Sequence, residues 1–416
     1  MANAVSDPLF DPAVVEDPYP YYAELRETDP VHELPGTGAF LVTRMDLIHE
    51  VVAKPGVFSS VSTRFLHHRA NGGAPGLRSV APDSDFGAGQ GAVLATADPP
   101  DHGRQRKVVT RRLSTTVMQE MEPEFRELVD RTLDAALAEG RIEWMSRLAE
   151  PLPMIMVARI LGLDDALAPV LKEQGYASVE AISGFVSDER LAELGAPMMN
   201  VGPVVDVYLE ARSARQCDPN TLIGVCAQAA EAGELTDLEA FATLFLIVSA
   251  GGESTTSLTG TGARILAECP DLQERLRREP HLIPAFVEEA CRIDPPFRGH
   301  YRHVVTDTEL GGVTLPADST VVLAWPAANR DRDAYPSPDD IDLDRPNPRQ
   351  HAGFGWGIHL CVGAPLARVE AKVAFEQLLS RTTSLSIDPS AEALRHHRSL
   401  MIRRLVELPL IFEAAE

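Results

Sequence analysis

The chain has few cysteines, and they are not arranged to form a disulfide framework or a zinc site. Only five occur among 416 residues, an odd number. They are scattered and lack the paired spacing of metal fingers: Cys217, Cys226, Cys269, Cys291 and Cys361. A disulfide-stabilised secreted scaffold and a structural zinc protein are therefore not expected.

Long apolar runs are also missing. The most apolar segment, Leu244–Ala250, is far too short to span a bilayer. The N-terminal stretch carries carboxylates where a signal peptide would have a basic region followed by an apolar one: Asp7, Asp11, Glu16 and Asp17. We therefore expect a soluble protein of the cytoplasm with no membrane partner.

Basic residues are outnumbered, with 38 Lys and Arg against 61 Asp and Glu, for a net charge of −23. Such an excess of negative charge disfavours binding to nucleic acids and to anionic membranes. There is no charge block, Ser/Gly linker or internal repeat to divide the chain. A long stretch rich in small residues, Asn71–Ala92, is expected to be a loop. We predict a single domain over residues 1–416.

Helical periodicity is the main pattern. Apolar residues recur at helical spacing through Glu120–Gly140, and the segments Leu152–Leu163 and Met198–Ser213 are similar. Strand-like pieces are short: Ala39–Thr43, Leu310–Leu315, Thr320–Trp325 and Leu405–Phe412. The pattern predicts a mainly α protein with a minor β region, without the regular β–α alternation of a doubly wound sheet.

The clearest helix is expected to begin at Thr236, which forms a capping box with Glu239, and to end near Cys269 before Pro270. At 1.5 Å per residue it would be about 50 Å long. It contains adjacent glycines, Ser249-Ala-Gly-Gly-Glu-Ser-Thr-Thr256. Each glycine costs a helix about 1 kcal/mol relative to alanine, so a compensating role is expected.

One cysteine lies in an unusual setting. Phe354-Gly-Trp-Gly-Ile-His-Leu-Cys-Val-Gly-Ala-Pro-Leu-Ala-Arg368 combines glycines that permit tight turns with a helix predicted to begin just after Cys361. A thiolate is stabilised at a helix N-terminus by free amide groups and the positive end of the dipole. The other four cysteines are expected to be small buried hydrophobes.

This string resembles the signature of the cytochrome P450 family at every fixed position. The resemblance implies a soluble bacterial-type haem-thiolate monooxygenase, folded as a triangular helical prism that encloses haem b (iron protoporphyrin IX). It implies that Cys361 is the metal ligand and that Gly363 lies beside the cofactor. It also implies a set of residues that bind the haem propionates: His102, Arg106, Arg302 and His359.

Within the long helix, the family motif A-G-x-[D/E]-T matches Ala250 to Ser254. The resemblance implies that Glu253 is the acid and Ser254 the alcohol of a proton relay to the activated oxygen. Serine replaces the usual threonine and lacks the methyl group that restricts its rotamer. Thr255, the next hydroxyl, is therefore kept as a candidate for the same catalytic role.

Glu289-Ala-Cys-Arg292 resembles the E-x-x-R pair of the family, at a spacing that places both side chains on one helix face. The resemblance implies that Glu289 and Arg292 are structural, and that Asn329–Arg332 and Asp342–Pro346 supply their partners. We assign this pair to the fold and to retention of haem.

For the substrate site the resemblance implies contacts from Val248, Ala250, Phe297, Arg298 and Met401. Arg298 could anchor an acidic substrate, or its side chain could point to solvent or to Asp294. Several basic residues near the Asn71–Ala92 loop agree weakly with an acidic substrate. A small organic substrate is expected, and both an aromatic acid and a terpenoid remain open.

The resemblance also implies insertion of one oxygen atom of O2 into a C–H bond, giving hydroxylation or oxidative dealkylation. Electrons would come from NAD(P)H through a reductase and a ferredoxin, as separate chains. A basic face of Arg104, Lys107 and Arg111 lies opposite His102 and Arg106 at helical spacing. It could bind an acidic ferredoxin or be merely solvated. Oxidative coupling, peroxide use and gas sensing are the alternative functions.

Overall fold

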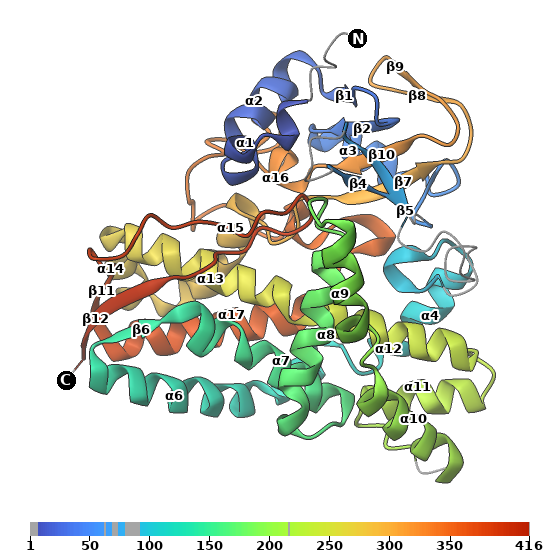
Figure 1. The fold of residues 1–416 in the computed structure, drawn as a ribbon. Coiled ribbons are helices and arrows are strands. Elements are labelled where there is room, and N and C mark those ends of the chain that lie inside the picture. The colour runs from blue at the N-terminus through green and yellow to red at the C-terminus, as the bar shows by residue number, and fades with distance from the viewer. Residues whose placement is uncertain (1–6, 62–63, 69–73, 80–91, 215–216, 416) are drawn as a thin grey trace.

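The computed structural model describes residues 7–61, 64–68, 74–79, 92–214 and 217–415. Most of the strands, with several short helices, gather at one end of the molecule, and long helices with a small second sheet form the block beside them (Figure 1). The helices of the first half are α1 (Pro12–Glu16), α2 (Tyr19–Thr28), α3 (Met45–Ala53), α4 (Asp101–Thr110), α5 (Thr115–Glu120), α6 (Glu122–Glu139), α7 (Pro151–Leu161), α8 (Ala168–Ala181), α9 (Asp188–Met198) and α10 (Gly202–Ala214). Those of the second half are α11 (Leu222–Glu231), α12 (Asp237–Gly251), α13 (Glu253–Glu268), α14 (Pro270–Arg278), α15 (Ile283–Ile293), α16 (Trp325–Ala328) and α17 (Ala364–Arg381).

The main sheet joins the two ends of the chain. The strands are β1 (Val31–Leu34), β2 (Ala39–Val42), β3 (Phe58–Ser59), β4 (Arg64–His67), β5 (Gly76–Ser79), β6 (Arg141–Glu143), β7 (His300–Val304), β8 (Thr308–Leu310), β9 (Val313–Leu315), β10 (Thr320–Leu323), β11 (Thr382–Ile387) and β12 (Pro409–Ala414). The sheet order β1-β2-β10-β7-β3 pairs early strands with late ones, seen as blue beside orange in Figure 1. A second sheet has the order β11-β12-β6.

Most predicted elements are present. The Glu120–Gly140 pattern corresponds to α6, which ends at Gly140 in the left-handed conformation (φ 67°). The segment Leu310–Leu315, expected as one strand, is instead a hairpin, because Gly311 (φ 58°) and Gly312 (φ 82°) form a turn between β8 and β9. The predicted loop Asn71–Ala92 contains β5, while its residues 71–73 and 80–91 lie outside the described part.

The long helix predicted from Thr236 is interrupted. Its capping box is confirmed, since the amide of Glu239 donates to the Thr236 hydroxyl (3.1 Å) and the Thr236 amide to the Glu239 carboxylate (2.8 Å). The helix breaks at Gly252, between α12 and α13. A Cβ atom at Gly252 would lie 2.0 Å from the sulfur of Met154, so this glycine permits close packing against α7.

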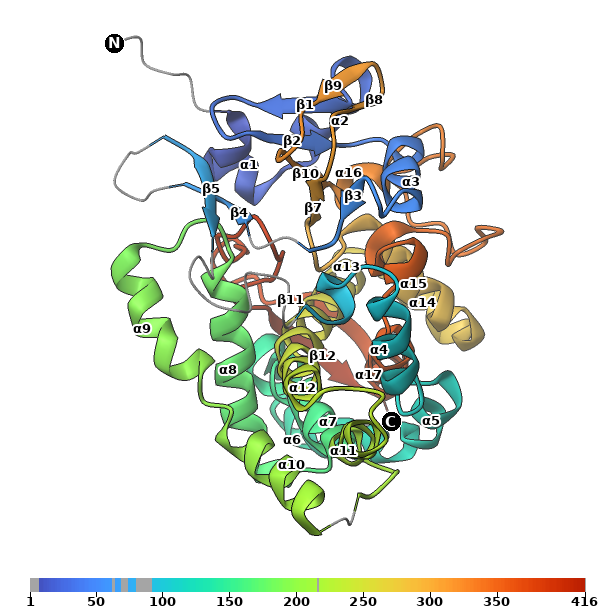
Figure 2. The same ribbon diagram turned by 90° about the vertical axis from the view of Figure 1, so that its right-hand side faces the viewer.

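Outside this block, α8, α9 and α10 run along one side of the molecule (Figure 2). Among the described residues no helix combines the length and apolar character needed to cross a bilayer.

The predicted E-x-x-R pair is completely buried. Arg292 donates to both carboxylate oxygens of Glu289 (2.7 and 2.8 Å), and its other N–H groups reach the carbonyls of Asn329, Pro338 and Asp340. Arg345 donates to the same carboxylate (3.0 Å). Both predicted partner segments are therefore in contact with the pair. Because no charge or donor here faces water, the network ties α15 to the chain that leads into the cysteine loop.

Breaking this network should destabilise the protein strongly. Replacing Arg292 by leucine leaves the Glu289 carboxylate buried without its main counterion, which costs about 3–5 kcal/mol. We expect a large fall in the thermal unfolding midpoint of Arg292→Leu, measured on the protein as purified. The exposed pair Arg190–Glu180 provides the control, and Arg190→Ala should leave the midpoint unchanged. Equal midpoints for the two variants would contradict a structural role for Arg292.

Candidate active site

The cysteine loop is shaped by its glycines. Gly355 (φ 74°) and Gly357 (φ 69°) adopt the left-handed conformation, which side chains disfavour. The loop closes through a hydrogen bond from the Cys361 amide to the Phe354 carbonyl (2.8 Å). The helix predicted after the cysteine is α17, which begins at Ala364. Cys361 therefore lies at a helix N-terminus, as the sequence indicated.

The electrostatic surroundings of the thiol have two opposing parts. Although Cys361 is open to solvent on one side, the surrounding protein raises its pKa by desolvation. The amides of Gly363 and Ala364, and then Arg106 and Arg368, lower it. The helix terminus acts in the predicted direction, but burial outweighs it. A cation bound to the sulfur would favour the thiolate.

The four predicted propionate-binding residues converge from three elements. His102 and Arg106 lie on α4, Arg302 on β7 and His359 in the cysteine loop. The rings of His102 and His359 are 4.2 Å apart between centroids. Arg106 donates to the Leu360 carbonyl (2.6 Å), and Arg302 to that of Tyr301 (2.8 Å).

The four predicted propionate-binding residues carry positive charge that no ion pair within the described chain balances. Burial, followed by nearby positive groups, lowers the pKa of His359 to about 3, and burial also lowers that of His102, so both rings are neutral. Burial lowers the pKa of Arg302 to about 10, which still leaves it cationic at neutral pH. Among the described residues neither Arg106 nor Arg302 has a carboxylate in an ion pair. The buried cation of Arg302 and the half-buried cation of Arg106 therefore call for an anionic partner.

One buried polar atom in this cluster, on His359, has no hydrogen-bond partner and indicates what kind of group would fit here. The Nε2 atom of His359 is hydrogen-bonded to the Ser60 hydroxyl (2.9 Å), whereas its Nδ1 atom is buried with no partner in the described chain. Two guanidinium groups and two neutral imidazoles beside a cysteine sulfur match a group with two carboxylates and a thiolate-binding metal. The residues present fit haem b.

The candidate acid and alcohols separate onto different sides of α13. Ser254 is half-buried and its hydroxyl donates to the Ala250 carbonyl (2.7 Å). Ala250 itself is exposed. Thr255 is buried, and its hydroxyl lies beside Glu370 of α17, where it opposes the strong rise that burial causes in the Glu370 pKa. Ser254 and Ala250 thus share an accessible face, and Thr255 points into the core.

Glu253 has a partner that the sequence did not reveal. Arg404 donates to one carboxylate oxygen of Glu253 (3.0 Å) and also to Glu150 (2.9 Å), which Lys172 contacts from the outside. The second oxygen of Glu253 is buried without a partner among the described residues. Burial raises the pKa of Glu253, and Arg404 opposes this rise.

The predicted substrate contacts do not all face one space. Ala250 is exposed, and Phe297 is half-buried and bridged to Ile402. Val248 is fully buried in the core beside α8, so its side chain faces away from Ala250. Met401 is nearly buried in an apolar cluster against which Phe297 packs.

Arg298 points away from the predicted substrate site. Its guanidinium is buried and donates to the Val15 carbonyl at the N-terminal helices, and Tyr22 lies close enough to influence its charge. Strand-like alternation after Phe297 turns the two neighbouring side chains in opposite directions. Of the two orientations considered for Arg298, the structure is closer to the one that points away from the substrate site. Its partner is the Val15 carbonyl, not Asp294 or solvent. The structure gives no support to an acid anchor at Arg298.

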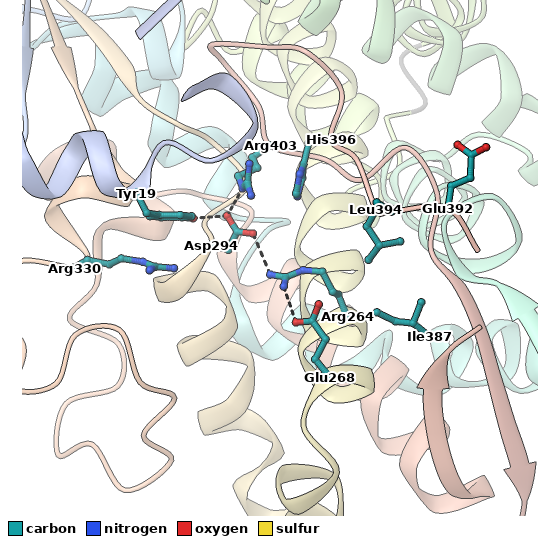
Figure 3. A pocket seen from close by; sticks show the side chains of 11 residues that line it. Tyr19, Arg264, Glu268, Asp294, Arg330, Ile387, Glu392, Leu394, His396 and Arg403 are labelled. Carbon is teal, nitrogen blue, oxygen red and sulfur yellow. Dashed lines mark hydrogen bonds and ion pairs between the residues drawn. The ribbon is translucent and has the colours of Figure 1, made fainter. Parts of the chain in front are cut away.

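Asp294 lines a separate pocket of about 550 Å³, many of whose other lining residues are charged (Figure 3). Its carboxylate accepts from Tyr19 (2.5 Å) and Arg403 (2.7 Å) and lies 3.5 Å from a nitrogen of Arg264. Arg330 stacks over the Tyr19 ring. Tyr19, Arg264 and Arg403 bring three distant parts of the chain to the Asp294 carboxylate, so we assign the pocket to the fold.

The basic face proposed for a ferredoxin is largely engaged within the protein. Arg104 pairs with Glu239 and Asp101, and Arg111 pairs with Glu234. Lys107 is exposed on the same helix. Of the three predicted residues, only Lys107 has no ion pair within the described chain.

The chain is similar to known proteins along almost its whole length. The cytochrome P450 family model matches residues 205–403. Cytochrome P450 144 of Mycobacterium tuberculosis is 38% identical, covering 97% of this chain and 90% of that protein. The 6-deoxyerythronolide B hydroxylase of Saccharopolyspora erythraea is 31% identical, covering 95% and 96% respectively. The crystal structure of CalO2 has a TM-score of 0.84 at 28% identity and covers 98% of both chains.

The fold, the cysteine loop and the similarity along almost the whole chain lead to the same assignment. The chain belongs to the cytochrome P450 family, whose members are haem-binding monooxygenases with a cysteine thiolate ligand.

Proposed function

We propose that this enzyme inserts one oxygen atom of O2 into a C–H bond of a small apolar molecule, by hydroxylation or by the dealkylation that can follow. The observation that carries the proposal is the Ser254 hydroxyl on the accessible face of α13 beside the exposed Ala250, with the buried carboxyl of Glu253 one residue earlier in the chain. Protons must be delivered in a reaction that reduces dioxygen, and an acid beside an alcohol can deliver them. Oxygen binding or gas sensing alone gives this pair no role.

Each residue then has a defined task. Cys361 would bind the haem iron, and His102, Arg106, Arg302 and His359 would hold the propionates. The bound haem supplies dioxygen activation, and its thiolate ligand favours O–O cleavage. Ser254 would hold and pass a proton at its Oγ atom. Glu253, whose pKa is raised by burial, would replenish that proton while Arg404 fixes the position of its carboxylate.

For the substrate, the direction of Arg298 favours apolar contacts over a carboxylate anchor. Ala250 and Phe297 are the predicted contacts that face accessible space, and neither carries charge. We therefore favour a terpenoid-like substrate over an aromatic acid. The relative named 6-deoxyerythronolide B hydroxylase supports the same reaction type. A screen for the substrate-induced spin-state shift, with terpenoids and matched aromatic acids, tests this choice.

We propose that electrons arrive from NAD(P)H through a separate reductase and ferredoxin. Full turnover with both partners in 18O2 should place one labelled oxygen atom in the product. Turnover with hydrogen peroxide alone at the same rate would contradict the proposal in favour of peroxide use.

Removing the proposed metal ligand should abolish the spectrum that defines the family. We expect Cys361→Ala to lose the red-shifted Soret band of the reduced, carbon monoxide-bound protein, because only a thiolate ligand produces it. Cys269 was expected to be buried but is exposed, while Cys226 and Cys291 are buried as expected. Cys269→Ala therefore changes an accessible cysteine away from the site and is the matched control. A red-shifted band that persists in Cys361→Ala would rule out Cys361 as the ligand.

The two hydroxyls should respond differently to removal. We expect Ser254→Ala to lower the rate of product formation about 100-fold, the scale of a lost proton-transfer group, while NAD(P)H consumption continues. Thr255→Val should stay coupled, because that hydroxyl faces Glu370 and not the site. Product formed per NAD(P)H consumed is the measurement. Uncoupling in Thr255→Val alone would transfer the role to Thr255.

The docking proposal now rests on Lys107. Charge reversal in Lys107→Glu should raise the KM for an acidic ferredoxin several-fold at low salt, and the effect should fade at high ionic strength. Arg395→Glu changes an exposed arginine in the C-terminal segment and serves as control. Equal KM values for both variants would exclude this face as the docking site.

A further inference from the structure

One histidine near the cofactor site has no role so far. His300 begins β7, two residues before Arg302. Alternate residues of a strand face the same side, so His300 and Arg302 lie on one face. The His300 ring is 5.1 Å from that of Phe297 between centroids, and His300 contributes to the low pKa of His359. His300 therefore lies between Phe297, a predicted substrate contact, and the predicted propionate-binding residues Arg302 and His359.

A hydrogen bond from Trp325 fixes the orientation of the His300 ring. The indole nitrogen of Trp325, which is fully buried, donates a hydrogen bond to the Nδ1 atom of His300 (2.7 Å). An indole N–H can only donate, so Nδ1 must be the unprotonated acceptor. The neutral ring then carries its proton on Nε2. Burial, followed by Arg302, lowers the pKa of His300 to about 4, so protonation does not disturb this tautomer near neutral pH.

The Nε2–H group is a donor without an acceptor. Within the described residues no hydrogen bond to this atom accompanies the Trp325 contact. The charged and titratable neighbours on this side are Arg302 and His359. A guanidinium cannot accept a hydrogen bond, and within the described chain no hydrogen bond joins His300 to His359. An oxygen acceptor from a bound group is what the arrangement lacks.

We propose that His300 is a further haem-binding residue, whose Nε2–H donates to the propionate held by Arg302, with Trp325 as the positioning residue that fixes the tautomer. The proposal rests on the propionate assignment made above. Arg106 and Arg302 already match the charge of two carboxylates. A neutral donor adds a hydrogen bond at this site without adding a third positive charge.

Two replacements separate the contact with Trp325 from the contact with haem. The side-chain oxygen of His300→Asn can still accept from the indole, but asparagine is too short to reach the Nε2 position. The longer His300→Gln variant places an amide N–H near that position. His303→Asn changes a partly exposed histidine on the opposite face of the same strand and is the matched control.

The measurements are the rate of haem transfer from the holoprotein to excess apomyoglobin and the propionate bending bands in resonance Raman spectra. We expect haem loss to be about 10-fold faster in His300→Asn, the scale of one hydrogen bond to a charged group, with a shifted propionate band. His300→Gln should restore both, and His303→Asn should match the unchanged enzyme. Trp325→Phe should broaden or shift the same band by releasing the tautomer.

Unchanged haem loss and unchanged propionate bands in His300→Asn would overturn the proposal. A weaker substrate-induced spin shift with normal haem retention would instead make His300 a substrate contact, which also overturns it. If His300→Asn does not fold, Trp325→Phe decides, because it leaves the histidine in place. The reduced carbon monoxide spectrum, recorded on every sample, reports thiolate ligation independently. Failure of the monooxygenase proposal is therefore distinguishable from failure of this one.

Discussion

The carboxylate of Glu289 is the centre on which the architecture around the site depends. It is fully buried and is held by Arg292, Arg345 and the amide of Asp342. Arg292 in turn donates to the backbone carbonyls of Asn329, Pro338 and Asp340. A buried charge is tolerated only with such complete pairing. The segment before the cysteine loop contains little regular structure, so this network, together with the contacts of Glu288 to His351 and Arg368, holds the loop against α15.

A second constraint is the positive charge prepared for the cofactor. Arg302 is nearly buried and donates only to the neighbouring carbonyl among the described residues, and Arg106 only to Leu360. The protein alone does not neutralise these groups. Binding of an anionic group beside these residues would therefore be coupled to folding, because it would offset the cost of burying Arg302, and part of Arg106, without a counterion.

Local sequence patterns predicted the parts of the site that depend on short-range geometry. The family resemblance pointed to Cys361, to His102 with Arg106 and to Glu289 with Arg292. The spacing of each pair then predicted that its two side chains share one helix face, and the glycines predicted a helix start after the cysteine. The helix cap at Thr236 was predictable for the same reason. What could not be predicted were contacts made by residues far apart in the chain.

Arg404 is the clearest example, since it lies 151 positions from Glu253 and follows no recognisable spacing. The orientation of Arg298 depends on Val15, at the other end of the sequence. The direction of Thr255 depends on Glu370 of α17. In each case a residue type was visible in the sequence, but the surface that receives its side chain is assembled only by the tertiary fold.

The interruption of the long helix at Gly252 limits how this enzyme could be engineered. Replacing a helical glycine by alanine is a common route to higher thermal stability, but here the added methyl group would meet the Met154 sulfur at 2.0 Å. Oxidation of that methionine to the sulfoxide would add an oxygen atom to the same crowded, buried thioether. Stability to heat and stability to oxidants therefore depend on the same contact, between Gly252 and Met154, immediately before Glu253 in the chain.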